Sequence, residues 1–251
     1  MKKIQLGNTG ILVSPLADGT GTSGWAGSSN QTRKGRNWLP DIFTRALDLG
    51  VNFWDLADMY GSHPYAARAL EHIHREDVVI LTKTTSTGHE DCRRDVERFL
   101  DELGTGYLDI VLLHGLTDPH WNKTQKGGMD ALSECKKDKI IKAVGVSCHS
   151  LGALDAAADD PWTDVILARL NYDGCHMDAD PEEVIPVVRR AKDNGKVVLA
   201  MKVLGRGSLR RDPEKAIRFV MDLGCVDAIT IGPEKISHVE RNIEIMEKLG
   251  Y

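Results

Sequence analysis

The sequence lacks the features that mark membrane, secreted and nucleic-acid-binding proteins. No apolar run approaches the ~20 residues that a membrane-spanning helix needs. The basic start MKKIQLGNTG has no apolar stretch behind it and is not typical of a signal peptide. The net charge is −5, from 32 basic and 37 acidic residues without a run of like charge, so no basic patch is indicated. We therefore expect a cytoplasmic protein without a nucleic-acid or membrane partner.

Paired cysteines are also missing. The five cysteines are odd in number and show no CxxC spacing, which favours reduced thiols over a disulfide framework. His63, His114, His149, Cys148 and Cys175 show no HxxxH, HxH or CxxC spacing, so the sequence predicts no metal site.

No linker rich in proline or serine divides the chain. With 251 residues, of which 41% are hydrophobic, the chain is long enough to bury a full core as one large domain. We expect residues 1–251 to form a single domain that is a monomer or a weak homo-oligomer.

Apolar runs alternate with amphipathic segments along the whole chain. Runs such as VILARL and KVVLAM are typical of strands buried on both faces in a parallel sheet. Eight strand–helix units in about 250 residues predict a single (β/α)8 TIM barrel. A hairpin turned at Asn8-Thr9-Gly10 is expected to cover the bottom of the barrel. An open doubly wound sheet is disfavoured, because the glycine-rich dinucleotide fingerprint does not follow the first strand. The helices are expected at 40–49, 65–73, 90–102, 127–137, 151–158, 181–194, 212–223 and 235–248.

Ionisable side chains recur where these strands end. The segment VNFWDLADMY supplies Asp55 and Tyr60, VVILTK ends in Lys83, and LDIVLLH ends in His114. An acid at the end of an apolar strand costs free energy unless something pairs with it. Asp55 or Asp58 could simply cap the following helix. Four such groups at one rim of a barrel, where active sites gather, instead favour catalysis.

These segments resemble the aldo-keto reductase family. NFWDLADMYG is similar to the family motif NxxDTAxxYG, and LTKT, DIVLLH and IKAVGVSCHS resemble the next three family segments. The likeness runs from LGNTGILVSPLADGTGT to ITIGPEKISHVERNI, and the segment MKVLG resembles that of some bacterial relatives. The resemblance implies an enzyme that uses a nicotinamide cofactor to reduce aldehydes or ketones to alcohols. It implies that the catalytic residues are Tyr60, Lys83, Asp55 and His114.

The chemistry of these side chains fits carbonyl reduction. The developing alkoxide needs a proton, and tyrosine, with an ordinary pKa near ~10, is a poor acid at neutral pH. A buried ammonium at Lys83 is expected to lower the pKa of Tyr60. Asp55 would keep Lys83 charged and in place, and His114 would orient and polarise the carbonyl oxygen.

The resemblance also indicates where the cofactor binds. Ser147 and Asn171 fall where family members bind the nicotinamide carboxamide, and Asn242 matches the adenine contact. Glu234 stands where a phosphate-binding arginine is common, with Lys235 and His238 as positive groups nearby, so NADP is modestly favoured and NAD is possible. Backbone donors near Gly205 could bind the pyrophosphate. The predicted cofactor-binding residues are Gly19, Thr20, Ser147, Asn171, Lys202, Gly205, Lys235, His238 and Asn242.

Two other functions remain open at this point. Phosphate-binding barrels that are isomerases or lyases also place Lys, Asp and His at strand ends. A cofactor-binding regulatory or redox-sensing subunit, similar to the reductase-like β subunits of potassium channels, would keep the same residues with little turnover. The partner expected for an enzyme is a small carbonyl substrate, whose identity the loops do not reveal.

Overall fold

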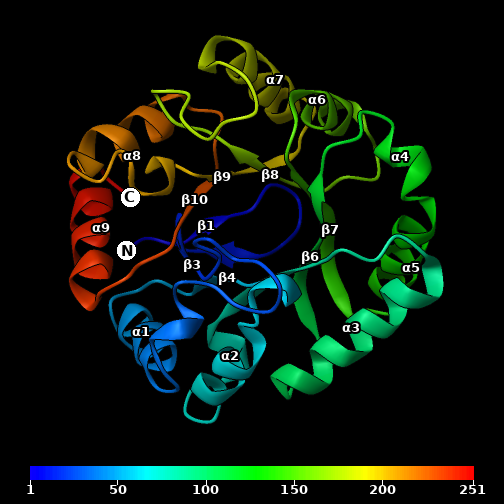
Figure 1. The fold of residues 1–251 in the computed structure, drawn as a ribbon, viewed down its shortest axis with the longest axis horizontal. Coiled ribbons are helices and arrows are strands. Elements are labelled where there is room, and N and C mark those ends of the chain that lie inside the picture. Colours follow the sequence, from blue (N-terminus) through cyan, green and yellow to red (C-terminus); the bar gives the residue numbers. More distant parts are fainter.

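The structure is a computed structural model that describes residues Met1–Tyr251, and its centre is a closed barrel of eight parallel strands (Figure 1). The strand β10 pairs with both β9 and β3 and thereby closes the barrel. The predicted (β/α)8 barrel is confirmed, and the open sheet is excluded. The barrel strands are β3 (Leu16–Gly19), β4 (Phe53–Asp55), β5 (Val79–Thr84), β6 (Leu108–Leu116), β7 (Ile141–Cys148), β8 (Val165–Arg169), β9 (Val197–Met201) and β10 (Ala228–Ile231).

Helices surround the barrel and cover the outer face of its sheet (Figure 1). Two of them begin at side-chain caps: Ser150 accepts a hydrogen bond from the backbone of Ala153, and Asp212 accepts one from Lys215. The helices are α1 (Trp38–Asp48), α2 (His63–Leu70), α3 (His89–Leu103), α4 (Trp121–Thr124), α5 (Lys126–Lys137), α6 (Leu151–Asp159), α7 (Pro181–Asp193), α8 (Pro213–Asp222) and α9 (Ile236–Lys248). Short 3₁₀ turns are η1 (Thr32–Lys34), η2 (Asp58–Tyr60), η3 (Arg75–Asp77) and η4 (Gly205–Gly207). None of these helices combines the length and the hydropathy of a transmembrane segment.

Alternation along the strands divides the buried apolar residues into two clusters. Outward-facing side chains pack against the helices in a cluster of 54 buried residues, in which Trp54 stacks on Phe43. Inward-facing side chains, such as Phe53, Leu81 and Leu167, fill the barrel in a second cluster of 16. The barrel is therefore a packed core, and a ligand can enter only at its ends.

The N-terminal hairpin closes one of these ends. Strands β1 (Ile4–Gln5) and β2 (Leu12–Val13) pair antiparallel. Their neighbours Leu6 and Ile11, together with Val13, belong to the inner cluster. A side chain at Gly7 would begin 3.0 Å from Val197, the first residue of β9. The hairpin thus seals the amino-terminal end of the barrel as expected, and the carboxyl end stays open.

Candidate active site

The open end of the barrel is lined by the last inward-facing residue of each strand. Side chains alternate along a strand, so on six of the strands the inward set continues two residues beyond the inner cluster, whereas Met201 on β9 still belongs to that cluster. In chain order these residues are Gly19, Asp55, Lys83, His114, Ser147, Arg169, Met201 and Thr230. Polar and ionisable groups therefore replace apolar ones at this level of the barrel, and each must find a partner or a ligand.

Asp55 and Lys83 form a buried ion pair on adjacent strands. Lys83 is fully buried, and its Nζ donates to Oδ1 of Asp55 and, at 2.7 Å, to the carbonyl of Leu56. Thr230 donates to Oδ2 of Asp55 at 2.7 Å. Burial lowers the pKa of Lys83, and Asp55 opposes this effect. Asp55 does not cap α2, which begins after Ser62.

Tyr60 lies directly beside this pair. Lys83 Nζ is 5.0 Å from the centre of the Tyr60 ring, and Tyr60 Oη is hydrogen-bonded to Nε2 of His114 at 3.2 Å. Two glycines make room for the ring, because a Cβ at Gly21 or Gly24 would approach it to 2.4 Å. The structure thus brings together Asp55, Lys83, Tyr60 and His114, the four residues predicted from the sequence to be catalytic. Their catalytic roles stay predictions.

The pKa values of Tyr60 and His114 are shifted mainly by burial. Burial, and then the charge of Asp55, raise the pKa of Tyr60, while Arg169 acts in the opposite direction. The sequence predicts that Lys83 lowers the pKa of Tyr60. The structure differs, because the loss of hydration raises this pKa by more than nearby cations lower it. Burial also lowers the pKa of His114 well below its ordinary value. At neutral pH the site therefore holds a protonated phenol next to a neutral imidazole.

The buried imidazoles make the stability of the fold sensitive to acid. Burial, reinforced by Arg169, lowers the pKa of His149 to about 3, and the pKa of His114 is also lowered. Since unfolded histidine has a pKa of ~6.5, only the unfolded chain binds these protons just below that pH, and the free energy of unfolding falls as pH falls. Between pH 7 and pH 5 we expect a loss of about 2 kcal/mol from His149 and a further loss from His114, measured by urea denaturation. The variant His149→Asn should show a smaller loss, and equal stabilities at both pH values would contradict this account.

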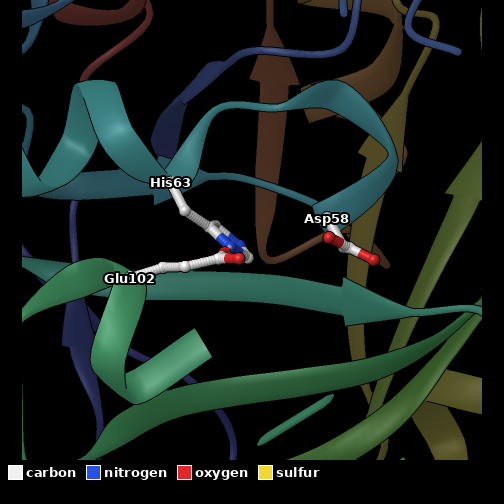
Figure 2. A group of neighbouring side chains, drawn as sticks. All are labelled: Asp58, His63 and Glu102. Atoms are coloured by element: carbon white, nitrogen blue, oxygen red, sulfur yellow. Dashed lines mark hydrogen bonds and ion pairs between the residues drawn. The ribbon is translucent and has the colours of Figure 1, made fainter. Parts of the chain in front are cut away.

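One cluster has the composition of a metal site. The ligand atoms of Asp58, His63 and Glu102 lie within 4.8 Å of one another, with the His63 ring against Glu102 (Figure 2). Arg98 donates to both carboxylates at 2.8 Å. The two ring nitrogens of His63 contact Glu102 and Thr82, each at 2.7 Å. Protein donors thus occupy the cluster, which ties η2 to α3, and Asp58 is held by Arg98 and does not act as a helix cap.

Two cavities open at this end of the barrel. One, of about 530 Å³, is bounded by Tyr60, His114 and the loop residue Trp25, and we call it the catalytic cavity. The other, of about 360 Å³, starts at Asp55 and Tyr60 and extends to His238 in the first turn of α9; we call it the cofactor groove. Tyr60 borders both cavities, so a ligand in one can meet a ligand in the other at its hydroxyl group.

Three of the predicted cofactor-binding residues line the cofactor groove: Gly19, Lys202 and His238. Ser147 lies at the same level of the barrel, and its buried Oγ has no hydrogen-bond partner in the protein. Ser147 does not line the groove itself, but it pairs with Leu167, which does, and an unpartnered buried hydroxyl group is unfavourable.

The other predicted cofactor-binding residues do not line the cofactor groove. The Thr20 hydroxyl group donates to the backbone of Asp55 at 2.9 Å. The Asn171 amide donates to the carbonyls of Cys175 and Lys202. Both side chains therefore stabilise the backbone around the site through these hydrogen bonds. Gly205 packs against Cys175, Lys235 is exposed just before α9, and Asn242 is buried in α9.

Some residues of the site were missed by the sequence analysis. Arg169 lines the catalytic cavity, Thr230 and Arg210 line the cofactor groove, and Arg206 borders both. The sequence could have indicated Arg169 and Thr230, because side chains alternate along a strand and each of the two lies two residues beyond an apolar residue that faces the barrel interior.

Comparisons with known proteins identify the family and agree with the fold. Residues 16–220 match the sequence model of the Aldo/keto reductase family. The chain is 27% identical to the NADH-specific methylglyoxal reductase of Escherichia coli over 83% of its own length and 69% of that protein. It is 26% identical to the aldo-keto reductase yakc [NADP(+)] of Schizosaccharomyces pombe over 67% of its length and 52% of that protein. The fold matches the holo form of the aldo-keto reductase AKR11C1 from Bacillus halodurans with a TM-score of 0.81 and 21% identity, covering 98% of this chain and 91% of that one.

Proposed function

The chain belongs to the aldo/keto reductase family, and on that premise we propose that it reduces an aldehyde or ketone to an alcohol with a nicotinamide cofactor. The observation that carries this proposal is the contact between the Tyr60 hydroxyl group and His114 at 3.2 Å, beside the buried pair of Asp55 and Lys83. These groups lie where the catalytic cavity and the cofactor groove meet.

Each side chain has a separate task in this proposal. His114 is neutral and forms a hydrogen bond to the carbonyl oxygen, which holds the carbonyl carbon in place and polarises it. Tyr60, whose phenol is protonated at neutral pH, gives its proton to this oxygen as negative charge develops there. Lys83, 5.0 Å from the phenol ring, stabilises the phenolate that results. Asp55 and Thr230 fix the position of Lys83 and its charge.

The cofactor groove and Ser147 fit a nicotinamide dinucleotide. Arg206 and Arg210 line the groove and supply positive charge for a pyrophosphate. The unpartnered Oγ of Ser147 supplies a donor or acceptor for a carboxamide. When bound, the reduced nicotinamide supplies the hydride, and the chain supplies position and charge.

A direct assay tests the proposed function. The purified chain, mixed with NADPH or NADH and a simple aldehyde or ketone, should oxidise the cofactor only when the carbonyl compound is present, with stoichiometric formation of the alcohol. Binding of both cofactors without reduction of any carbonyl compound would overturn the proposal.

We further propose a modest preference for NADPH over NADH. Lys235 and the arginines of the groove favour a cofactor with an additional phosphate, whereas Glu234 in the same groove opposes it. Glu234 is held in place by Asn30, whose amide donates to it at 2.8 Å. The balance of these charges keeps the expected preference small, and relatives named for each of the two cofactors exist.

Removing the charge of Glu234 should strengthen the preference for NADPH. In Glu234→Gln the side chain keeps its shape but no longer repels a 2′-phosphate, which at a partly exposed site is worth about 0.5–1 kcal/mol, or about twofold to fivefold in affinity. Calorimetric titration with both cofactors measures the ratio of dissociation constants. The affinity for NADH should barely change, and an unchanged ratio would show that the 2′-phosphate lies away from Glu234.

A further inference from the structure

The catalytic cavity is positively charged. Its 14 lining residues include Arg169, Lys202 and Arg206 but no aspartate or glutamate. Burial, and then the charges of Arg169 and Arg206, lower the pKa of Lys202 to about 8. A cleft lined by charges of one sign raises the local concentration of ligands of the opposite sign.

The backbone at Lys202 is held in a conformation that non-glycine residues rarely adopt. Its φ angle is +60°, in the left-handed region, which is unfavourable for a residue with a Cβ and tends to persist at functional sites. Two hydrogen bonds to its carbonyl maintain this conformation, from the backbone of Gly205 at 2.7 Å and the amide of Asn171 at 3.1 Å. The strain places a cationic side chain, which has no ion-pair partner, where both cavities meet.

Arg169 has a hydrogen-bond donor that is not used within the protein. Its Nη1 donates to Asp178 at 2.8 Å, which fixes the guanidinium group from one side. Its Nε is buried and has no partner in the protein. A guanidinium edge with free donors is suited to bind a carboxylate or a phosphate in a bidentate manner.

We propose that the carbonyl substrate carries an anionic oxygen group, a carboxylate or a phosphate, and that Arg169 and Lys202 bind this group inside the catalytic cavity. This inference rests on the proposed reductase function and specifies its substrate class. Arg169 lines the same cavity as Tyr60 and His114, so one substrate molecule can present its anionic group to Arg169 and its carbonyl group to Tyr60.

The phosphates of the cofactor do not account for Arg169. Lys202 and Arg206 border both cavities and can serve either ligand, whereas Arg169 lines only the catalytic cavity. The location of Arg169 therefore indicates an anionic group on the substrate and not one on the cofactor.

Matched pairs of substrates test the inference. The wild-type chain with NADPH is assayed with 4-oxobutanoate against its methyl ester, and with glyceraldehyde 3-phosphate against glyceraldehyde. We expect kcat/KM to be about 10-fold to 100-fold higher for the charged member of one pair, as for hydrogen bonds to charged groups. The pair that responds identifies carboxylate or phosphate. Equal values within both pairs would overturn the inference and leave the reductase function standing.

A double variant assigns the effect to Arg169. Arg169→Gln combined with Asp178→Asn removes both partners of the ion pair and avoids a lone buried carboxylate. The ratio of kcat/KM within the responding pair should fall toward one. The matched control is Arg190→Gln combined with Asp155→Asn, which likewise removes both partners of an arginine–aspartate pair but outside the barrel, and should keep the wild-type ratio. The wild-type ratios test the inference even if the double variant does not fold.

A binding measurement separates this inference from the reductase function. Succinate and inorganic phosphate are titrated by calorimetry into the chain loaded with oxidised cofactor. One of them should bind to the wild type and lose about 10-fold or more in affinity in the double variant. An unchanged affinity would overturn the inference, whether or not any carbonyl compound is reduced.

Discussion

The Tyr60→Phe variant should reduce carbonyl compounds about 10²-fold to 10⁴-fold more slowly than the wild type, the range that a general acid contributes. The substitution keeps the ring between Gly21 and Gly24 and removes only the hydroxyl group that contacts His114. Steady-state kinetics with a saturating cofactor measures the loss. The dissociation constant for the cofactor and the melting temperature should stay close to the wild-type values.

A second tyrosine provides the control. Tyr65 donates its hydroxyl group to the backbone of Thr32 at 2.7 Å, away from both cavities. Tyr65→Phe therefore makes the same chemical change and should leave the turnover rate near that of the wild type. If Tyr60→Phe also kept near-wild-type activity, Tyr60 would be a packing residue and the reductase mechanism would fail.

The Lys83→Met variant should lose both activity and stability. Methionine keeps most of the volume of the side chain but leaves Asp55 buried without its cationic partner. Removing one partner of a buried ion pair costs about 3–5 kcal/mol of unfolding free energy. Activity should disappear as well, because the phenolate of Tyr60 loses the ammonium group nearby. Urea denaturation and turnover assays on the same preparation measure the two losses.

Removing both charges should separate these two losses. In the double variant Lys83→Met with Asp55→Asn no buried charge is left unpaired, and the asparagine that replaces Asp55 still has a carbonyl oxygen for the hydrogen bond from Thr230. We expect most of the stability to return while the enzyme stays inactive. A stable single variant Lys83→Met would show that the carboxyl group of Asp55 does not depend on this partner in the folded protein.

The sequence was sufficient to predict the barrel and four of the residues at its open end. Long apolar runs separated by amphipathic helices permit few arrangements other than a parallel barrel. Once the strands are parallel, the residues at their carboxyl ends must converge, which is why Asp55, Lys83 and His114 could be placed together from distant segments. Tyr60 follows Asp55 within one short turn, so its position was fixed as well.

The contacts that depend on strand register and loop conformation could not be predicted in this way. Arg169 ends a run that the sequence presents as continuously apolar, and its partner Asp178 comes from the loop that follows. Thr230 reaches Asp55 across the seam where β10 meets β3. Asn171 has an amide group that could bind a carboxamide, but in the structure this amide donates a hydrogen bond to the carbonyl of Cys175 in the loop after β8. The sequence shows the type of each side chain, whereas its partner depends on backbone geometry.

Because Tyr60 packs against Gly21 and Gly24, its pKa depends on the conformation of the loop that contains these glycines. The segment from Gly21 to Ser28 covers the phenol, and its Gly27 donates to the backbone of Met59 at 2.9 Å. Because burial is the largest cause of the raised pKa of Tyr60, hydration of the ring would return that pKa toward ~10. Substitutions that loosen this loop are therefore expected to change the pH profile of the proton donor without altering any ionisable group.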